Sequence, residues 1–238
     1  MRVLIGLENN NEGRSVAWAL EHPGCTAFGE DGKSAVFNMS LAIPEYIAWM
    51  EKHTSTPWFS PQDIDIRLVD EYDDYQIDKS FNEVETNGSY VKAFFKYDWK
   101  PLTREDVEHG LEILAWTRKD FFAVIDRLSD RQLALKFPEE RWSLKEIIAH
   151  VGRSEWWLQD RIGRSHDISL LKEDPFERIV EERGHFITIL PELIDLQHVV
   201  GKDGEIWSPR KVLRRVIYHE RDHTQHILKL LLRDAENS

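Results

Sequence analysis

The feature that most constrains the fold of this chain is a long helical pattern close to its C-terminus, in which histidines occupy inward-facing positions. Ser208 is a suitable N-cap and Pro209 suits the first helical position, and the pattern extends to about Arg233. One face of this helix, with spacings of three and four residues, carries Val212, Val216, His219, His223, His226 and Leu230. This spacing is typical of a helix face that packs into a bundle. Because a buried imidazole needs a partner, the pattern predicts that these histidines have one.

Two of these histidines have the spacing of metal ligands. His219 and His223 lie one helical turn apart, so their side chains project side by side and can bind one ion. His226 lies on the same helix, and the three together would span about two turns, too far for all of them to bind one ion at ~2.1 Å. A third ligand must therefore come from elsewhere in the chain.

Composition limits the class of protein. The chain has 238 residues, of which 41% are hydrophobic, a formal net charge of −12 and one cysteine, Cys25. A single cysteine excludes an internal disulfide and fits a reducing compartment, and the negative charge argues against nucleic-acid or anionic-membrane partners. No segment approaches the ~18 apolar residues that span a bilayer, and the start of the chain lacks the features of a signal peptide. We therefore expect a cytoplasmic protein that binds neither nucleic acid nor membrane.

The hydrophobic period changes near residue 100, which predicts two domains, 1–100 and 101–238. The first is expected to be a small α+β domain with strands and one main helix, which Pro44 would kink or restart. Its expected strands lie at about 3–7, 15–20, 64–68 and 90–97, and its helix at 33–52. The second is expected to be an all-α four-helix bundle. Its helices are expected to start after Thr103, after Ser143, near Pro175 and after Ser208.

The N-terminal domain resembles the HicB antitoxin-type fold. The residues that carry this resemblance are His22-Pro23-Gly24-Cys25, then Gly29-Glu30-Asp31, then a helix that contains Ala35, Asn38, Ala42, Ile43 and Tyr46. In that family a Pro-Gly-Cys turn follows the second strand, and a strand and an alanine-rich helix come next. The resemblance implies a HicB-like α+β domain that recognises a partner.

The C-terminal domain, from about 103 to 233, resembles the DinB-like (YfiT-like) four-helix superfamily. The resemblance rests on Trp142-Ser143-Leu144-Lys145-Glu146-Ile147-Ile148-Ala149-His150, together with His219-x-x-x-His223 on the last helix. It implies that His150, His219 and His223 bind a divalent metal, and imidazole ligands suit Zn²⁺ and Ni²⁺. It also implies a low-molecular-weight thiol as cofactor and a thiol-dependent transfer to a small-molecule substrate.

Other interpretations of the histidines remain open at this point. They could be hydrogen-bonded core or surface residues without a metal. The run His219-Glu220-x-x-His223 also matches the zinc-protease motif, in which the glutamate is the general base; here Glu220 is expected to be exposed or to support the ligands instead.

An open site of three histidines leaves coordination positions for water or substrate, as catalytic sites do. A metal-bound thiol would make the protein a transferase, and a metal-bound water would make it a hydrolase. The competing class is a non-catalytic metal-binding or protein-interaction module, in which the bundle forms a homodimer. The sequence assigns no catalytic or cofactor-binding side chain beyond the three metal ligands.

Overall fold

A computed structural model describes residues 2–58, 64–73, 76–78, 80–84 and 91–236. The chain divides into two compact units, and each is described separately below. The first contains residues 1–100 and 199–211, and the second contains 101–198 and 212–238. The segment 199–211 therefore groups with the N-terminal residues, although it follows most of the helical unit in the sequence.

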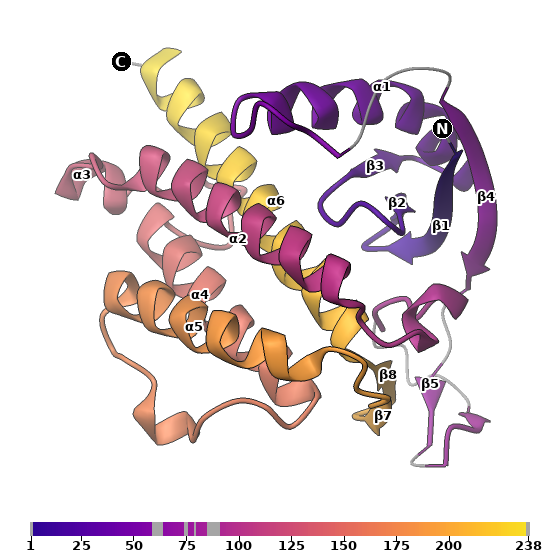
Figure 1. Cartoon of the computed structure of the whole chain (residues 1–238). Helices are drawn as coiled ribbons and strands as arrows, with labels where there is room; N and C mark the ends of the chain where they lie inside the picture. The colour runs from indigo at the N-terminus through magenta and orange to yellow at the C-terminus, as the bar shows by residue number, and fades with distance from the viewer. Residues whose placement is uncertain (1, 59–63, 74–75, 79, 85–90, 237–238) are drawn as a thin grey trace. The chain divides into compact units, whose positions relative to one another are not determined.

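The first unit is built on a mixed four-stranded sheet, as Figure 1 shows. Its secondary structure is β1 (Arg2–Asn11), β2 (Arg14–Ala19), β3 (Thr26–Gly29), α1 (Gly32–Glu51) and β4 (Asp65–Tyr72). The strand order is β3-β2-β1-β4, in which β1 and β4 are parallel and the other pairs are antiparallel. Parallel neighbours need a long crossover, and α1 lies within this connection.

The helix α1 forms where the sequence predicts it, but it is not interrupted. Asp31 caps its N-terminus through the backbone of Ser34, and Pro44 lies inside one continuous helix that ends at Glu51. Its buried face carries Ala35, Met39, Ile43, Tyr46, Ile47 and Met50. The expected restart at Pro44 is therefore wrong, because the packing of this face outweighs the loss of one backbone hydrogen bond.

The strand expected at 90–97 is also wrong over its described residues; residue 90 lies outside them. Residues 91–95 have no regular secondary structure and a short 3₁₀ helix, η1 (Lys96–Trp99), follows. Side-chain carboxylates, rather than a neighbouring strand, accept hydrogen bonds from the backbone of this segment. The amide of Lys92 donates to Glu205 (3.2 Å), that of Ala93 to Glu8 (2.9 Å), that of Phe95 to Asp98 (2.9 Å) and that of Lys96 to Asp70 (2.6 Å).

Two small hairpins in the first unit were not expected. They are formed by β5 (Gln76–Ile77) with β6 (Glu83–Val84), and by β7 (Val200–Lys202) with β8 (Glu205–Trp207). The second hairpin is held by Lys211, whose ammonium group is buried and donates to the carbonyl oxygens of Lys92 (2.7 Å) and Ile206 (2.8 Å).

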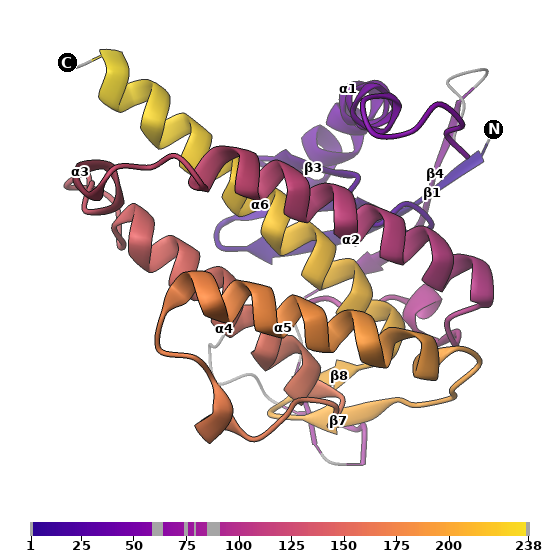
Figure 2. The same ribbon diagram turned by 60° about the vertical axis from the view of Figure 1, so that its left-hand side comes forward.

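The second unit consists of four long helices, as the sequence predicts (Figure 2). They are α2 (Arg104–Ile125), α4 (Leu144–Arg161), α5 (Pro175–Ile189) and α6 (Pro209–Glu236), and the first turn of α6 belongs to the first unit. A short helix, α3 (Asp130–Leu133), lies between α2 and α4. The capping boxes expected at Thr103 and Ser143 are both present.

One apolar core receives side chains from all four long helices of the second unit. It contains Phe121, Ile125, Leu144, Ile147, Ile148, Val151, Ile179, Ile227 and Leu230. Burial of these side chains, and not helix propensity alone, accounts for most of the stability of such helices. Among the described residues, no helix is both long enough and apolar enough to cross a bilayer.

The carboxyl group of Glu8 offers a test of the first unit. It is fully buried and accepts hydrogen bonds from the indole Nε1 of Trp18 (2.8 Å) and from the amide of Ala93 (2.9 Å). We expect Glu8→Ala to lower the free energy of unfolding by roughly 2–4 kcal/mol, because two buried donors lose this acceptor. Urea denaturation followed by tryptophan fluorescence measures the change. The exposed Glu21→Ala variant is the control, and equal midpoints for the two variants would contradict the prediction.

Candidate metal centre

Two helices of the second unit bring His150, His219 and His223 together. His150 lies on α4, and His219 and His223 lie one turn apart on α6. One ligand atom from each residue can be chosen so that all three atoms lie within 4.8 Å of one another. The Nε2 atoms of His150 and His219 are 3.0 Å apart. These three residues are called the histidine trio below.

The ring of His150 is held on two sides. The indole of Trp142, which comes just before α4, stacks on it with ring centroids 4.4 Å apart and an interplanar angle of 31°. The hydroxyl of Ser154, one turn further along α4, lies 3.4 Å from Nδ1 and 3.3 Å from Nε2 of His150. These two contacts limit the orientations that the His150 ring can adopt.

The chemistry of His223 fits a metal ligand. Its Nδ1 is buried and has no hydrogen-bond partner among the described residues. Burial, followed by the proximity of His150 and His226, lowers the pKa of His223 to about 3. The imidazole is therefore neutral at pH 7 and keeps a lone pair, as a metal ligand must. A buried ring nitrogen without a partner is costly for the protein, and coordination of a metal would satisfy it.

His226, which continues the same face of α6, is not part of the trio. Its ring centroid is 6.0 Å from that of His223, and its Nε2 lies 3.1 Å from a carboxylate oxygen of Glu140. Glu140 belongs to the connection between α3 and α4. His226 thus borders the trio and is oriented by a carboxylate.

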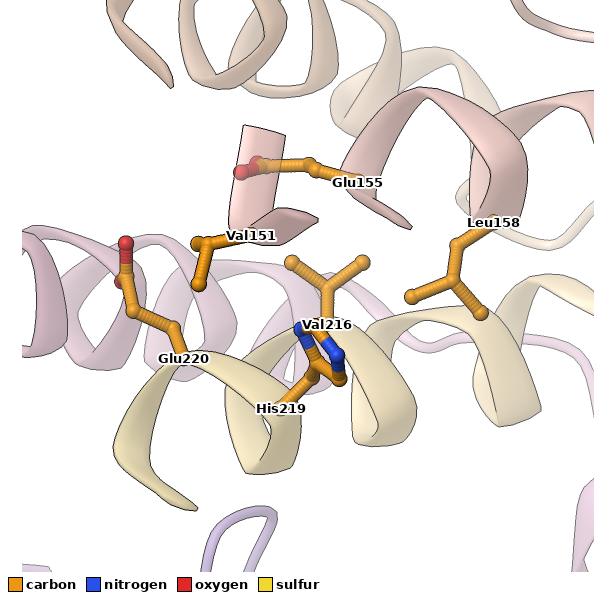
Figure 3. A pocket seen from close by; sticks show the side chains of 6 residues that line it. All are labelled: Val151, Glu155, Leu158, Val216, His219 and Glu220. Atoms are coloured by element: carbon orange, nitrogen blue, oxygen red, sulfur yellow. The ribbon is translucent and has the colours of Figure 1, made fainter. Parts of the chain in front are cut away.

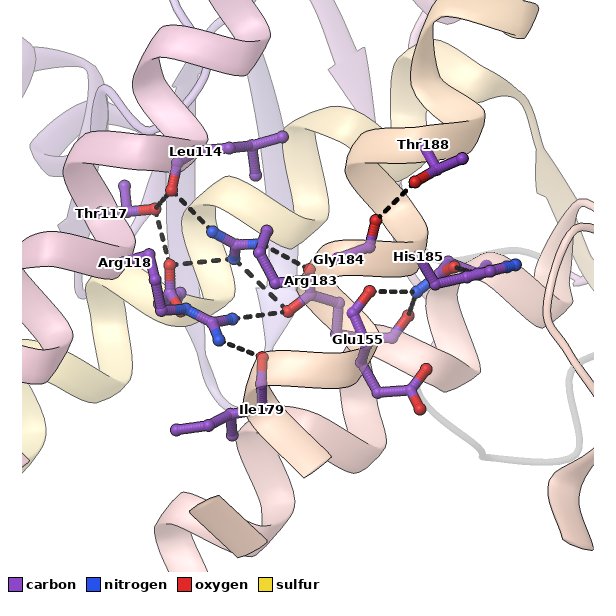
Figure 4. A network of polar contacts seen from close by, with 12 residues as sticks. Leu114, Thr117, Arg118, Glu155, Ile179, Arg183, Gly184, His185 and Thr188 are labelled. Carbon is purple, nitrogen blue, oxygen red and sulfur yellow. Dashed lines mark hydrogen bonds and ion pairs between the residues drawn. The ribbon is translucent and has the colours of Figure 1, made fainter. Parts of the chain in front are cut away.

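Glu220 is not exposed, although it lies between two ligands in the sequence. Its side chain is 1% exposed and accepts three hydrogen bonds from α2 and α5. The donor residues Thr117, Arg118 and Arg183 are labelled in Figure 4. Oε1 accepts from Arg118 (2.6 Å), and Oε2 accepts from Thr117 (2.6 Å) and Arg183 (2.9 Å). Burial alone would raise the pKa of Glu220, but the charges of Arg183 and Arg118 outweigh burial and hold this pKa below its usual range. A carboxylate so placed is a poor general base at neutral pH, which argues against the zinc-protease interpretation.

A small pocket lies next to His219 on the inner side of the trio. It is lined by Val151, Glu155, Leu158, Val216, His219 and Glu220, which come from α4 and α6 (Figure 3). The pocket leaves no room for a water molecule. All three histidines are partly exposed.

Three other histidines of the second unit, His166, His185 and His198, have separate partners. The Nε2 of His166 lies 2.7 Å from the buried carboxylate of Glu182, and the Nδ1 of His185 lies 2.5 Å from the side-chain oxygen of Gln159. The Nε2 of His198 lies 3.0 Å from the carbonyl oxygen of Ile162. None of the three is part of the trio.

Residues 113–227 match the model of a protein family described as the DinB superfamily. The match covers slightly less than half of the chain, lies mainly in the second unit and includes the whole trio. The helical unit therefore contains a DinB-like region. No curated protein matches the chain.

Among solved structures, YfiT from Bacillus subtilis is similar to this chain, with 18% identity and a TM-score of 0.45. The similarity covers 56% of this chain and 90% of YfiT, which is described as a probable metal-dependent hydrolase with an unusual four-helix bundle topology. A similarity this distant carries no argument about the function of this chain.

The lowered pKa of His223 predicts how the stability of the metal-free protein depends on pH. Unfolded His223 takes up a proton near its ordinary pKa of 6.5, whereas folded His223 does so only near 3. Its contribution to stability is therefore complete above pH 6.5 and is lost as the pH falls toward 3, by up to about 1.4 kcal/mol per pH unit. Urea unfolding in EDTA between pH 7.5 and 5 should show a shallower fall for His223→Gln than for the wild type. If the free energy of unfolding falls equally steeply with pH in both proteins, the pKa of His223 is not lowered in the folded state.

Proposed function

We propose that the second unit binds one divalent metal ion through His150, His219 and His223 and uses the remaining coordination positions for catalysis. The observation that carries this proposal is the convergence of three imidazoles from two helices, with ligand atoms within 4.8 Å of one another. The buried Nδ1 of His223, which has no partner among the described residues, gives independent support. Imidazole ligands suit both Zn²⁺ and Ni²⁺, and three protein ligands leave an open site.

We propose thiol-dependent transfer as the reaction of this site. A bound divalent ion would lower the pKa of a coordinated thiol or water. A low-molecular-weight thiol loses its proton more readily than water does, which supports a thiol as the nucleophile that attacks a small electrophilic substrate.

We also propose that the first unit is a HicB-like domain that recognises a partner. The order of two strands, a turn at Pro23-Gly24-Cys25, a third strand and then a helix supports this proposal. Cys25 is 2% exposed, so its place in the turn is structural. A direct test is whether residues 1–100 are required for co-purification of any protein with the full chain. Identical co-purified proteins with and without these residues would refute a recognition role.

The metal proposal predicts the stoichiometry of metal binding. Protein purified without a nickel column and then loaded with Zn²⁺ or Ni²⁺ should contain close to one ion per chain. His219→Ala should lose this binding, because only one of the two ligands on α6 remains. Its circular dichroism spectrum should show the same helix content as the wild type. His226→Ala is the matched control on the same helix, and it should retain the ion. Retention of the ion by His219→Ala would refute the site.

The transferase proposal is tested separately with the metal-loaded protein. We expect consumption of a small thiol in the presence of an electrophile, loss of this activity in a chelator, and recovery when the metal is returned. Ester and amide substrates without thiol provide the comparison. Hydrolysis of these substrates with no thiol consumption would show that metal-bound water is the nucleophile, and the protein would be a hydrolase.

A further inference from the structure

The contacts of Glu220 belong to a larger buried network to which each long helix contributes one charged side chain. We call this network the charge ring; it consists of Arg118 on α2, Glu155 on α4, Arg183 on α5 and Glu220 on α6. Glu155 binds the same two arginines as Glu220, Arg118 at 2.9 Å and Arg183 at 2.6 Å. The exposed fractions of the four side chains are 10% or less. Charges of opposite sign thus alternate around the ring.

The charge ring connects the two helices that carry the histidine trio. Glu220 directly follows His219 on α6, and Glu155 directly follows Ser154, the residue that contacts His150 on α4. Two buried carboxylates repel each other, so these helices cannot be held by Glu155 and Glu220 alone. Each arginine binds both carboxylates. The two arginines therefore fix the position of α6 relative to α4 within about one helical turn of the ligands.

We propose that Glu220 is a positioning residue of the metal centre. Through Arg118 and Arg183 it holds α6 against α4, so that His219 and His223 face His150 before a metal is bound. This inference rests on the proposed metal site. It assigns the glutamate of the His-Glu-x-x-His run a role different from that of a general base.

Replacement of Glu220 by glutamine tests this role without a change in side-chain size. One carboxylate oxygen accepts from Arg118, and the other accepts from Thr117 and Arg183. In either orientation of the glutamine, its NH₂ group faces an arginine N–H, and two donors cannot form a hydrogen bond. The contacts between the charge ring and α6 must therefore be lost, although all three histidine ligands are still present.

Glu182 provides the matched control. Its side chain is also 1% exposed and is paired with a cation-forming group, His166, at 2.7 Å. It lies on α5, and among the described residues its carboxylate pairs with His166 rather than with an arginine of the charge ring. Glu182→Gln therefore removes a buried carboxylate from the same unit without opening the ring.

The experiment is a Zn²⁺ titration of the full chain in competition with a chromophoric chelator, under conditions in which circular dichroism shows each variant to be folded. We expect Glu220→Gln to weaken Zn²⁺ affinity by about tenfold or more, the effect typical of groups that orient metal ligands. Glu182→Gln should bind Zn²⁺ as the wild type does. Equal affinity for Glu220→Gln and wild type, or equal weakening by both substitutions, would overturn the inference.

Two further results separate this inference from the proposed function. If the wild type binds no Zn²⁺ or Ni²⁺, the proposed metal site fails, and the positioning role fails with it. If Glu220→Gln does not fold, Thr117→Val replaces it, because this substitution removes only the hydroxyl that donates to Glu220. Thr117→Val should weaken Zn²⁺ affinity and Thr117→Ser should restore it; unchanged affinity in Thr117→Val would overturn the inference.

Discussion

Charges buried between helices must be compensated inside the protein, and this requirement organises the second unit. The cost of burying a carboxylate or a guanidinium alone is several kcal/mol, yet Arg118, Glu155, Arg183 and Glu220 are all buried in one core. They are tolerated because each carboxylate binds two arginines and each arginine binds two carboxylates. The network is satisfied in the arrangement of the four helices that the structure shows, in which the trio also converges. The apolar core supplies the driving force for folding.

The parts of the structure that follow from local interactions could be predicted from the sequence. Thr103 and Ser143 mark the starts of α2 and α4 because a cap depends on residues three positions away. The proximity of His219 and His223 follows from the geometry of a single helix. The approach of His150 depends on the packing of α4 with α6, and it was predicted through a family resemblance rather than from the spacing of residues.

Interactions between residues distant in the sequence explain what could not be predicted. The apolar run at 91–95 has the composition of a strand, but its amides bind carboxylates such as Glu8 and Glu205, which lie far away in the chain. The sequence indicates the charge ring only in part. Arg118 and Arg183 lie at helix positions where the spacing of the apolar residues predicts another apolar residue. That signal indicates buried charges. It does not reveal which charge binds which.

The carboxylates that bind residues 92–96 have a consequence for solubility. An apolar extended segment with free backbone donors is a template on which another chain can add a strand, and proteins block such edges in several ways. Here the amides of Lys92, Ala93, Phe95 and Lys96 are already occupied. Acidic side chains of the first unit thus supply the acceptors that a neighbouring strand would otherwise provide, and these amides are not available to a strand of another chain.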